Sequence, residues 1–324
     1  MIKFAALTAL LLFANGAIAT PSSAQLQKEF VDQMVQKHGF EANSLNTLLN
    51  SAKVRKPILE AIARPAEKRL NWGQYRKIFL TKSRTAGGLK FWKENAETLQ
   101  RASEKYGVPP QIIVAIIGVE TRYGKHTGGY PVLDALVTLG FHYPKRGKFF
   151  RSELSHFLRL AREENLDPHE PSGSYAGAMG RPQFISSSYR SYAVDFDGDK
   201  KRDIWNNNVD VIGSVANYFA RHAWKAGKPV AQRVQGVNKN HKSIIKAGYK
   251  PSIKIADLQA KGIKLREPLP AQSKAALLEL KTEKGNQHWL AMDNFYVITR
   301  YNHSPLYAMA VFQLSEAIKA LHEK

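Results

Sequence analysis

Glu120 is the residue of this 324-residue chain best placed for acid–base chemistry. It ends a run that is apolar on every side, from Pro109 to Val119, and Gly124 follows as a left-handed cap. We therefore expect a short helix, buried all round, with Glu120 in its last turn. The negative end of the helix dipole and the apolar neighbours both disfavour a carboxylate, so Glu120 is suited to donate a proton to a leaving group. The alternative is a structural acid paired with Arg122 or a nearby lysine.

A second group of oxygen donors follows residue 194. Carboxylates stand there at alternate positions, as in a loop that offers hard oxygen ligands to calcium. The standard loop has glycine at its sixth position and glutamate at its twelfth, where this chain has Lys200 and Asn206. A metal-free turn is therefore the alternative. The candidate metal ligands are Asp195, Asp197, Asp199, Lys201 and Asp210.

Residues 173–180 contain three glycines and two alanines. Small side chains let the backbone come close to another part of the chain or to a ligand. Ser174 and Gln183 place polar groups beside this surface. No Lys-Ser or Lys-Thr follows the glycines, so the segment is not a phosphate-binding loop. Packing alone is the alternative.

The elements that must position these groups are mostly helical. Residues 64–90 are interpreted as a polar connection, because they show little apolar periodicity before Gly88. Residues 225–290 combine scattered Pro and Gly with many Lys and short β-branched runs, which indicates a small β-rich insertion. The apolar periodicity predicts helices over 26–63 with a break at Gly39, and over 88–106, 132–139, 149–165, 209–223 and 294–322.

The N-terminus has the pattern of a secretory signal peptide over residues 1–19. A lysine precedes an apolar run, and Ala17-Ile18-Ala19 offers a small-x-small cleavage site. The run is shorter than the roughly 20 residues that a spanning helix needs. The chain has no cysteine, so it offers no lipid-carrying Cys and no disulfide. We therefore expect a soluble periplasmic protein without a lipid anchor.

The net charge is +21, from 48 Lys and Arg against 27 Asp and Glu, which predicts a polyanionic partner. Nucleic acid is the usual interpretation, but an exported protein more often meets acidic polysaccharide, cell-wall peptides or a membrane surface. Lys145 and Arg146 form either a solvated turn or contacts to substrate carboxylates. The charge alone does not choose among these partners.

Several motifs in this order resemble the lytic murein transglycosylase B family. The resemblance covers nearly the whole mature chain. It implies a mainly α fold, with a lysozyme-like helical core, an additional helical domain and a small β-rich domain. The corresponding ranges are 20–100 completed by 291–324 for the N-terminal helical domain, 101–224 for the core and 225–290 for the β-rich domain. The motifs that carry the resemblance are 72–76, 117–124, 173–180 with Gln183-Phe184, the loop from Asp195 to Ile204-Trp205, and 300–304.

The resemblance also implies roles for individual residues. Glu120 becomes the acid/base, and Lys145 and Arg146 meet the stem peptide. The Asp195 loop resembles the family's metal-binding loop. The chain departs from the family pattern at Arg181-Pro182 and at Ile185-Ser186, which bears on the local groove shape. The substrate groove would be lined by Tyr75, Ser174, Gln183, Tyr218, Tyr301, Asn302 and Tyr307.

The family cleaves the β-1,4 bond between MurNAc and GlcNAc in peptidoglycan. An ordinary glycosidase needs two carboxylates, and the Glu120 motif has no second acid, although Asp134 or Glu153 could approach in space. The resemblance implies that Glu120 protonates the glycosidic oxygen and then takes the proton of the substrate's C6 hydroxyl, which attacks to give a 1,6-anhydro end. No cofactor is required for the chemistry, and the Asp195 loop is a candidate site for a structural Ca²⁺. We expect a monomer that binds glycan strands and stem peptides, not nucleic acid. The alternatives are a lysozyme-type hydrolase and a non-catalytic binder of anionic wall polymer.

Overall fold

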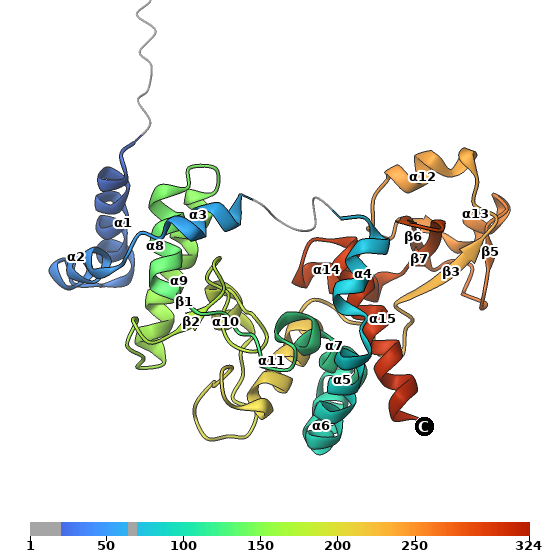
Figure 1. Cartoon of the computed structure of the whole chain (residues 1–324), viewed down its shortest axis with the longest axis horizontal. Helices are drawn as coiled ribbons and strands as arrows, with labels where there is room; N and C mark the ends of the chain where they lie inside the picture. Colours follow the sequence, from blue (N-terminus) through green and yellow to red (C-terminus); the bar gives the residue numbers. More distant parts are fainter. Residues whose placement is uncertain (1–20, 64–69) are drawn as a thin grey trace, which may run out of the picture.

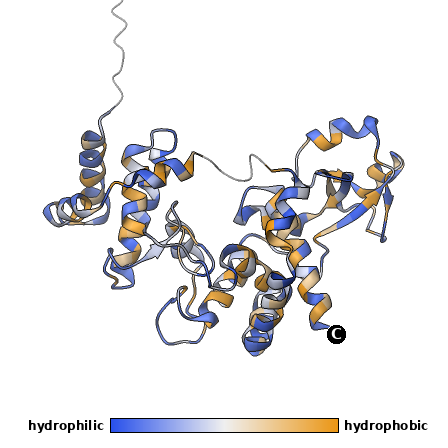
Figure 2. Cartoon of the chain, viewed as in Figure 1, coloured by the Kyte–Doolittle hydropathy of each residue, from blue (hydrophilic) through white to orange (hydrophobic). Residues whose placement is uncertain are grey.

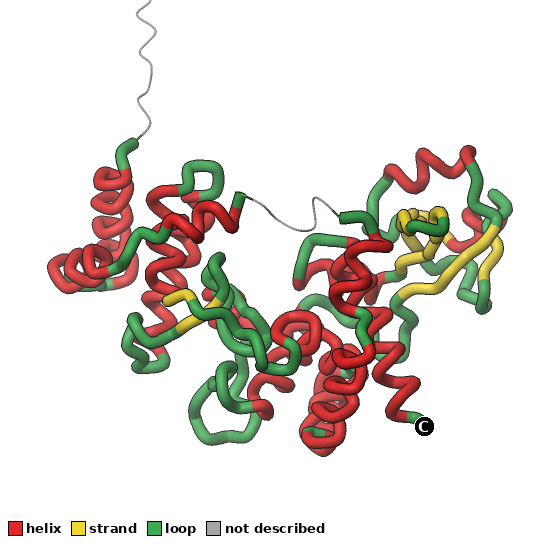
Figure 3. Tube along the Cα trace, viewed as in Figure 1, coloured by secondary structure: helices red, strands yellow, loops and turns green. Residues whose placement is uncertain are grey.

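The computed structural model describes residues 21–63 and 70–324, and the predicted signal peptide lies outside this part of the chain. The fold is mainly helical with a small sheet at one end, as predicted (Figures 1 and 3). The helices are α1 (Ser23–His38), α2 (Ala42–Ser51), α3 (Lys56–Ile62), α4 (Trp72–Phe79), α5 (Lys82–Glu94), α6 (Ala96–Tyr106), α7 (Pro110–Thr121), α8 (Val132–His142), α9 (Gly147–Glu163), α10 (Ser186–Tyr192), α11 (Asn208–Arg221), α12 (Lys242–Lys246), α13 (Ile255–Ala260), α14 (Asp293–Tyr301) and α15 (Pro305–His322), with the 3₁₀ helix η2 (Lys239–His241). The strands are β1 (Tyr130–Pro131), β2 (Ser172–Gly173), β3 (Ala231–Gln235), β4 (Ile253–Lys254), β5 (Lys264–Leu265), β6 (Lys274–Thr282) and β7 (Gly285–Ala291).

The two helices predicted over 26–63 are three helices. The first ends at Gly39, as expected, with a φ of 64°. The second break was not predicted, and it follows from long-range hydrogen bonds. The N–H of Lys53 donates to Asp134 and the N–H of Arg55 donates to Thr138, both on α8. These bonds hold the backbone between α2 and α3 out of the helix.

The interpretation of residues 64–90 as a polar connection is wrong where the structure describes them. Residues 72–79 and 82–94 form α4 and α5. The sequence signal was present, because Asn71 and Gln74 form a capping box and Thr81 caps α5. Glycines weaken the helical pattern here, but one of them is a contact point. A Cβ on Gly88 would lie 2.5 Å from Ile318 Cδ1, so α5 and α15 approach closely at this glycine.

Helix α7 lies at the centre of the core and contacts α5, α6, α11 and α15. Its residues from Ile112 to Val119 are all buried, which confirms the prediction of a helix without a solvent-facing side. The outer helices are amphipathic, and in Figure 2 hydrophobic and hydrophilic stretches alternate along them. The central position of α7 fixes Glu120 relative to all its neighbours.

The five-stranded sheet has the order β4-β6-β7-β3-β5, with antiparallel neighbours throughout. It lies beside α12 and α13 at one end of the molecule (Figure 1). Its own small core is made by Val234, Ile255, Leu258, Ile263, Ala275, Leu277, Leu290 and Met292.

The contacts between helices cut across the predicted domain ranges. Helices α1 and α3 pack on α8, and α1 also contacts α9, so residues 23–62 join the block at the opposite end from the sheet (Figure 1). Helices α4 and α5 pack on α15 instead. The N-terminal unit predicted over 20–100 therefore divides between two groups of contacts, and only its second part meets residues 305–322.

Candidate active site

Glu120 lies half-buried in the last turn of α7. The helix ends one residue later, and its C-cap is Arg122 with a φ of 51°, not Gly124 as expected. The N–H of Arg122 donates to Gly118 O at 3.2 Å and that of Tyr123 donates to Ile117 O at 3.3 Å. These bonds satisfy helix-end carbonyls, so the left-handed turn is stabilised without glycine at the cap.

The hydroxyl of Tyr307 donates a hydrogen bond to Glu120 Oε1. Tyr307 is buried near the start of α15, and burial together with the charge of Glu120 raises its pKa well above the ordinary value. The phenol therefore stays protonated and remains a donor. The ring of Tyr301 stacks on that of Tyr307 with 6.5 Å between centroids and 11° between planes.

The other predicted groove tyrosines gather around this pair. Tyr301 donates to Pro182 O at 2.6 Å, and Tyr218 donates to Arg300 O at 2.6 Å. The rings of Tyr218 and Tyr301 lie 4.7 Å apart. Tyr75 is buried on α4, close enough to Tyr307 to add to the rise in the pKa of Tyr307. Four helices thus bring their tyrosines to one place beside Glu120, and Asn302 directly follows the helix that carries Tyr301.

Ser174 and Gln183 hold the loop next to this tyrosine group. Ser174 Oγ accepts from the N–H groups of Ala176 and Ala178, at 3.3 and 3.1 Å. Gln183 Nε2 donates to Thr127 O at 2.9 Å and to Gly180 O at 3.0 Å. Both predicted groove residues therefore have a structural task in this loop.

The glycines of the same loop approach protein backbone. A Cβ on Gly173 would lie 2.2 Å from Ala178 O, and one on Gly180 would lie 2.5 Å from Ile204 O. The small residues of this loop thus allow its backbone to approach another part of the chain, which was one of the two expectations from the sequence. It joins the 173–183 loop to the segment that ends the Asp195 loop.

The two departures from the family pattern leave Gln183 anchored. The side chain of Arg181 donates to Asn208 Oδ1, and the carbonyl of Pro182 accepts the hydroxyl of Tyr301. Ser186 is buried at the first turn of α10, and its hydroxyl has no hydrogen-bond partner in the described part of the chain.

Lys145 and Arg146 are exposed on the turn between α8 and α9. The guanidinium of Arg146 lies over the ring of Phe149, 4.3 Å from its centroid. Neither residue is on the helices that carry Glu120 and the tyrosines.

The two candidate second acids are engaged elsewhere. Asp134 accepts from Arg55 Nε at 2.7 Å and from the N–H of Lys53 at 2.9 Å. Glu153 is buried and accepts from Ser187 through both its N–H and its hydroxyl. Burial raises the pKa of Glu153, with the Ser187 bonds acting in the opposite direction. These carboxylates hold α8 and α9 to neighbouring segments.

Three of the candidate metal ligands converge. Single carboxylate oxygens of Asp195, Asp197 and Asp210 lie within 4.8 Å of one another. Asp199 is not in this group, and its Oδ1 accepts the N–H of Lys201 at 2.8 Å. Asp210 is fully buried at the start of α11, and burial raises its pKa. Three hard oxygen donors at this spacing fit calcium.

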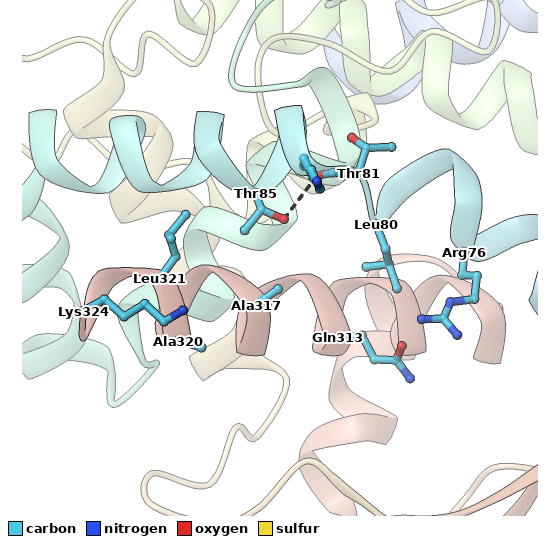
Figure 4. A pocket seen from close by; sticks show the side chains of 10 residues that line it. Arg76, Leu80, Thr81, Thr85, Gln313, Ala317, Ala320, Leu321 and Lys324 are labelled. Atoms are coloured by element: carbon cyan, nitrogen blue, oxygen red, sulfur yellow. Dashed lines mark hydrogen bonds between the residues drawn. The ribbon is translucent and has the colours of Figure 1, made fainter.

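Two surface hollows lie away from Glu120. One of about 520 Å³ runs between α4, α5 and α15, where Figure 4 shows Arg76 and Lys324 at its two ends. The other, of about 790 Å³, is polar and lies between the loop after α9 and the Asp195 loop, with Trp205 in its lining. Neither is lined by Glu120 or by the tyrosine group.

Arg84 is a site residue that was not predicted, because it lies within the segment interpreted as a polar connection. Arg84 is buried on α5, and its guanidinium reaches the last turn of α7. Recognising Thr81 as a helix N-cap would have placed Arg84 in a first helical turn.

A buried helix thus presents one carboxylate to a group of tyrosines, whereas Asp134 and Glu153 are engaged with other parts of the chain. The chain belongs to the transglycosylase SLT domain family, whose model matches residues 22–316. It is a lytic transglycosylase, so the predicted family and enzyme class are confirmed.

Relatives of known name agree with this assignment. The chain is 44% identical over 313 residues to the membrane-bound lytic murein transglycosylase B of Escherichia coli, covering 94% of this chain and 84% of the relative. The soluble lytic transglycosylase SltB1 of Pseudomonas aeruginosa has a TM-score of 0.87 and 46% identity, covering 93% of this chain and 100% of that one. The E. coli lytic transglycosylase Slt35 in complex with calcium has a TM-score of 0.84 and 43% identity, covering 92% and 94%. These relatives support neither the hydrolase nor the binder alternative.

Proposed function

We propose that this enzyme cleaves the MurNAc–GlcNAc β-1,4 bond of peptidoglycan and that Glu120 performs both proton transfers. As a neutral acid, Glu120 protonates the glycosidic oxygen. As a carboxylate, it then takes the proton from the C6 hydroxyl of the same MurNAc, whose oxygen attacks the anomeric carbon. The product ends in 1,6-anhydro-MurNAc, and no water is consumed. The nucleophile is already tethered to the reacting sugar, which removes most of the entropic cost of bringing it in.

One observation carries this proposal: Glu120 is held by Tyr307, whereas Asp134 and Glu153 are committed to other partners. A hydrolase of the usual kind needs a second carboxylate beside the first. A transglycosylase needs only one carboxylate. That group must be held within reach of both the glycosidic oxygen and the C6 hydroxyl of the substrate. The Tyr307 hydroxyl supplies that constraint, and the tyrosine rings offer flat apolar surfaces to sugar C–H groups.

The mass of the soluble products tests the proposal. Purified mature enzyme is incubated with peptidoglycan, and the released muropeptides are weighed. We expect masses that are lower by one water than those of reducing-end products. Reducing ends as the main product would establish a hydrolase instead.

We also infer that the stem peptide is held partly by charge, through Lys145 and Arg146. Both side chains are exposed on the α8–α9 turn, and stem peptides end in carboxylates. Exposed charges act over a Debye length of about 8 Å at physiological ionic strength. Lys145→Ala with Arg146→Ala should therefore weaken binding to peptide-bearing strands several-fold at low salt, and the loss should shrink as salt is added.

Strands stripped of their peptides are the control for this double variant, and their binding should change little. An equal loss on both substrates would assign Lys145 and Arg146 to the fold or to sugar binding, and the peptide contact would be discarded.

We propose that the Asp195 loop binds a structural calcium ion through Asp195, Asp197 and Asp210. The related Slt35 was solved with calcium. Asp199 and Lys201 belong to the predicted ligand set, although the Asp199 carboxylate lies outside the converging group. The ion would stabilise the loop that contacts Gly180 and would take no part in the proton transfers.

Calcium at ten times its Kd should raise stability by about 1.4 kcal/mol, following RT ln(1 + [L]/Kd). The melting temperature in millimolar calcium should therefore exceed that in chelator, and Asp197→Ala should abolish the difference. Lys200→Ala is a matched control on the same loop and should retain it. Identical melting temperatures in calcium and chelator would leave the loop as a metal-free turn.

We infer that the enzyme acts in the periplasm as a soluble monomer after cleavage behind Ala19. The pattern of residues 1–19 and the absence of cysteine support this inference. Within residues 21–63 and 70–324, no helix has both the length and the hydropathy needed to span a bilayer. N-terminal sequencing of the exported protein should begin at Thr20, and size-exclusion chromatography should give one chain.

A further inference from the structure

Arg84 is a buried cation on α5 that packs against the C-terminal end of α7, the helix that carries the proposed acid. Its side chain comes from the first turn of α5 and is 8% exposed. Arg84 Nη1 donates to Gly118 O at 3.2 Å and approaches Val119 O at 3.5 Å. Both carbonyls belong to the last turn of α7. The positive charge therefore lies against the negative end of the α7 dipole, one residue from Glu120.

This charge is not balanced by an acid in the described contacts of Arg84. Its Nε is buried without a hydrogen-bond partner in the described part of the chain, and its guanidinium carbon lies 5.0 Å from the centroid of the Phe79 ring. Burial is the main cause that lowers the pKa of Arg84 from its ordinary value, and the nearby Arg122 adds to it. A buried guanidinium is costly unless it is compensated, and here the compensating groups are helix-end carbonyls.

The surrounding structure fixes Arg84 in this position. Its N–H donates to the carbonyl and the side chain of Thr81, which caps α5. Its carbonyl accepts the hydroxyl of Tyr123 at 2.8 Å. Tyr123 in turn lies so close to Gly118 that a Cβ there would be 2.5 Å from the Tyr123 hydroxyl. The start of α5 and the end of α7 are therefore joined from both directions.

We propose that Arg84 is a positioning residue of the reaction: its buried charge offsets the helix dipole at Glu120 and holds the turn that presents this carboxyl group. The proposal rests on the acid/base role of Glu120 described above. Glu120 must be neutral to donate its proton and anionic to accept the next one. Burial and the dipole favour the neutral form, whereas Arg84 favours the anion, so the two states stay close enough in free energy for one residue to cycle between them.

A second guanidinium lies near the end of α7, because a Cβ on Gly124 would be 2.8 Å from Arg181 Nε, but the side chain of Arg181 donates to Asn208 Oδ1. From α14 and α15 the phenols of Tyr301 and Tyr307 face Glu120, and burial raises the pKa of both, so they stay neutral; the phenol of Tyr75 on α4 lies near Tyr307. Arg122, at the C-cap of α7 itself, is exposed. Three groups on α6 and α11 have partners of their own: Arg101 donates to Phe196 O, Tyr218 donates to Arg300 O, and Asp210 accepts from the N–H groups of Phe196 and Asp203.

The experiment compares pH profiles of kcat on peptidoglycan for Arg84→Gln, Arg84→Lys and Arg122→Gln. Arg84→Gln keeps a donor and removes the charge, so the proton should stay on Glu120 to higher pH. We expect the alkaline limb of its profile to move up by about one pH unit with little change in KM. Arg84→Lys keeps a charge on a shorter stem, farther from the carbonyls, and should move the limb about half as far. Arg122→Gln removes an exposed, solvent-screened charge and should leave the limb in place.

A purely structural Arg84 would give a lower melting temperature and an unmoved alkaline limb, and that result overturns the proposal. If Arg84→Gln does not fold, the decision rests on Arg84→Lys. An upward shift of the alkaline limb of its pH profile supports the proposal, and an alkaline limb at the wild-type position rejects it. Glu120→Gln, measured alongside, separates the two levels of inference. Loss of turnover there with an unmoved limb in both Arg84 variants rejects only the role of Arg84, whereas near-normal turnover of Glu120→Gln rejects the proposed function.

Discussion

Glu120→Gln should fold, bind glycan strands and release soluble fragments from peptidoglycan more than about 10⁴-fold more slowly than the wild type. One acid–base role is worth about 10²–10⁴ in rate, and the proposed mechanism gives Glu120 two in succession. Glutamine keeps the shape of the side chain, and its carbonyl oxygen can still accept the hydroxyl of Tyr307. The loss should therefore appear in kcat, measured by the release of soluble muropeptides, and not in binding to insoluble peptidoglycan.

Glu153→Gln is the matched control, because it makes the same change at another buried glutamate. Its amide can accept from the N–H of Ser187 and donate to the hydroxyl, so both native contacts have replacements. Turnover should stay within about two-fold of the wild type. Near-normal turnover of Glu120→Gln, or a collapse of turnover in Glu153→Gln, would remove Glu120 from its place as the sole acid–base group.

The stability of the Glu153→Gln variant should depend on pH differently from that of the wild type. Burial raises the folded-state pKa of Glu153, so this group contributes stability at low pH that is lost as the pH rises through its folded-state value. Glutamine does not titrate. The free energy of unfolding of Glu153→Gln should therefore gain on that of the wild type as the pH rises from about 4.5. Denaturant titrations at several pH values measure this difference.

Gly180→Ala should destabilise the enzyme by about 3 kcal/mol or more and should reduce turnover as well. An alanine in a left-handed conformation costs about 1–2 kcal/mol. At Gly180, which has a φ of 65°, the new Cβ would also lie 2.5 Å from the backbone oxygen of Ile204. That oxygen accepts the N–H of Arg181 at 2.9 Å, so it cannot move away without losing the bond. Gly180 O also accepts a hydrogen bond from Gln183, so a shift of the backbone at residue 180 would also displace a predicted groove residue.

Gly39→Ala isolates the backbone part of this effect. Gly39 has a φ of 64°, and a Cβ there would meet nothing within 4 Å. We expect a loss of about 1 kcal/mol and unchanged activity. Chemical denaturation of both variants gives the comparison. Equal losses at Gly39 and Gly180 would mean that the contact with Ile204 is not rigid and that the loop relaxes around an added methyl group.

Local physical chemistry made some features readable from the sequence. The run from Ile112 to Val119 has no polar face, so it can only be a buried helix, and the acid that follows must lie at the end of that helix. Gly39 ended α1 as expected, because glycine adopts the left-handed cap without strain. Five motifs in order, among them those around Glu120 and at residues 173–180, identified the family, which the comparisons confirmed.

The tertiary structure alone decided which groups meet. No spacing in the sequence indicates that the Tyr307 hydroxyl reaches Glu120, 187 positions away, or that Arg84 reaches the carbonyl of Gly118. Helix α4 and the first part of α5 were missed because glycines weaken the helical pattern there, and the packing of both helices on α15 outweighs that weakness. The sequence by itself therefore determined the family and the buried helix, with the proposed acid at the end of that helix. The tertiary structure decided which tyrosine holds the acid, which candidate acids are occupied elsewhere and which buried charge lies behind the helix, because these depend on contacts between elements that local propensity and periodicity do not encode.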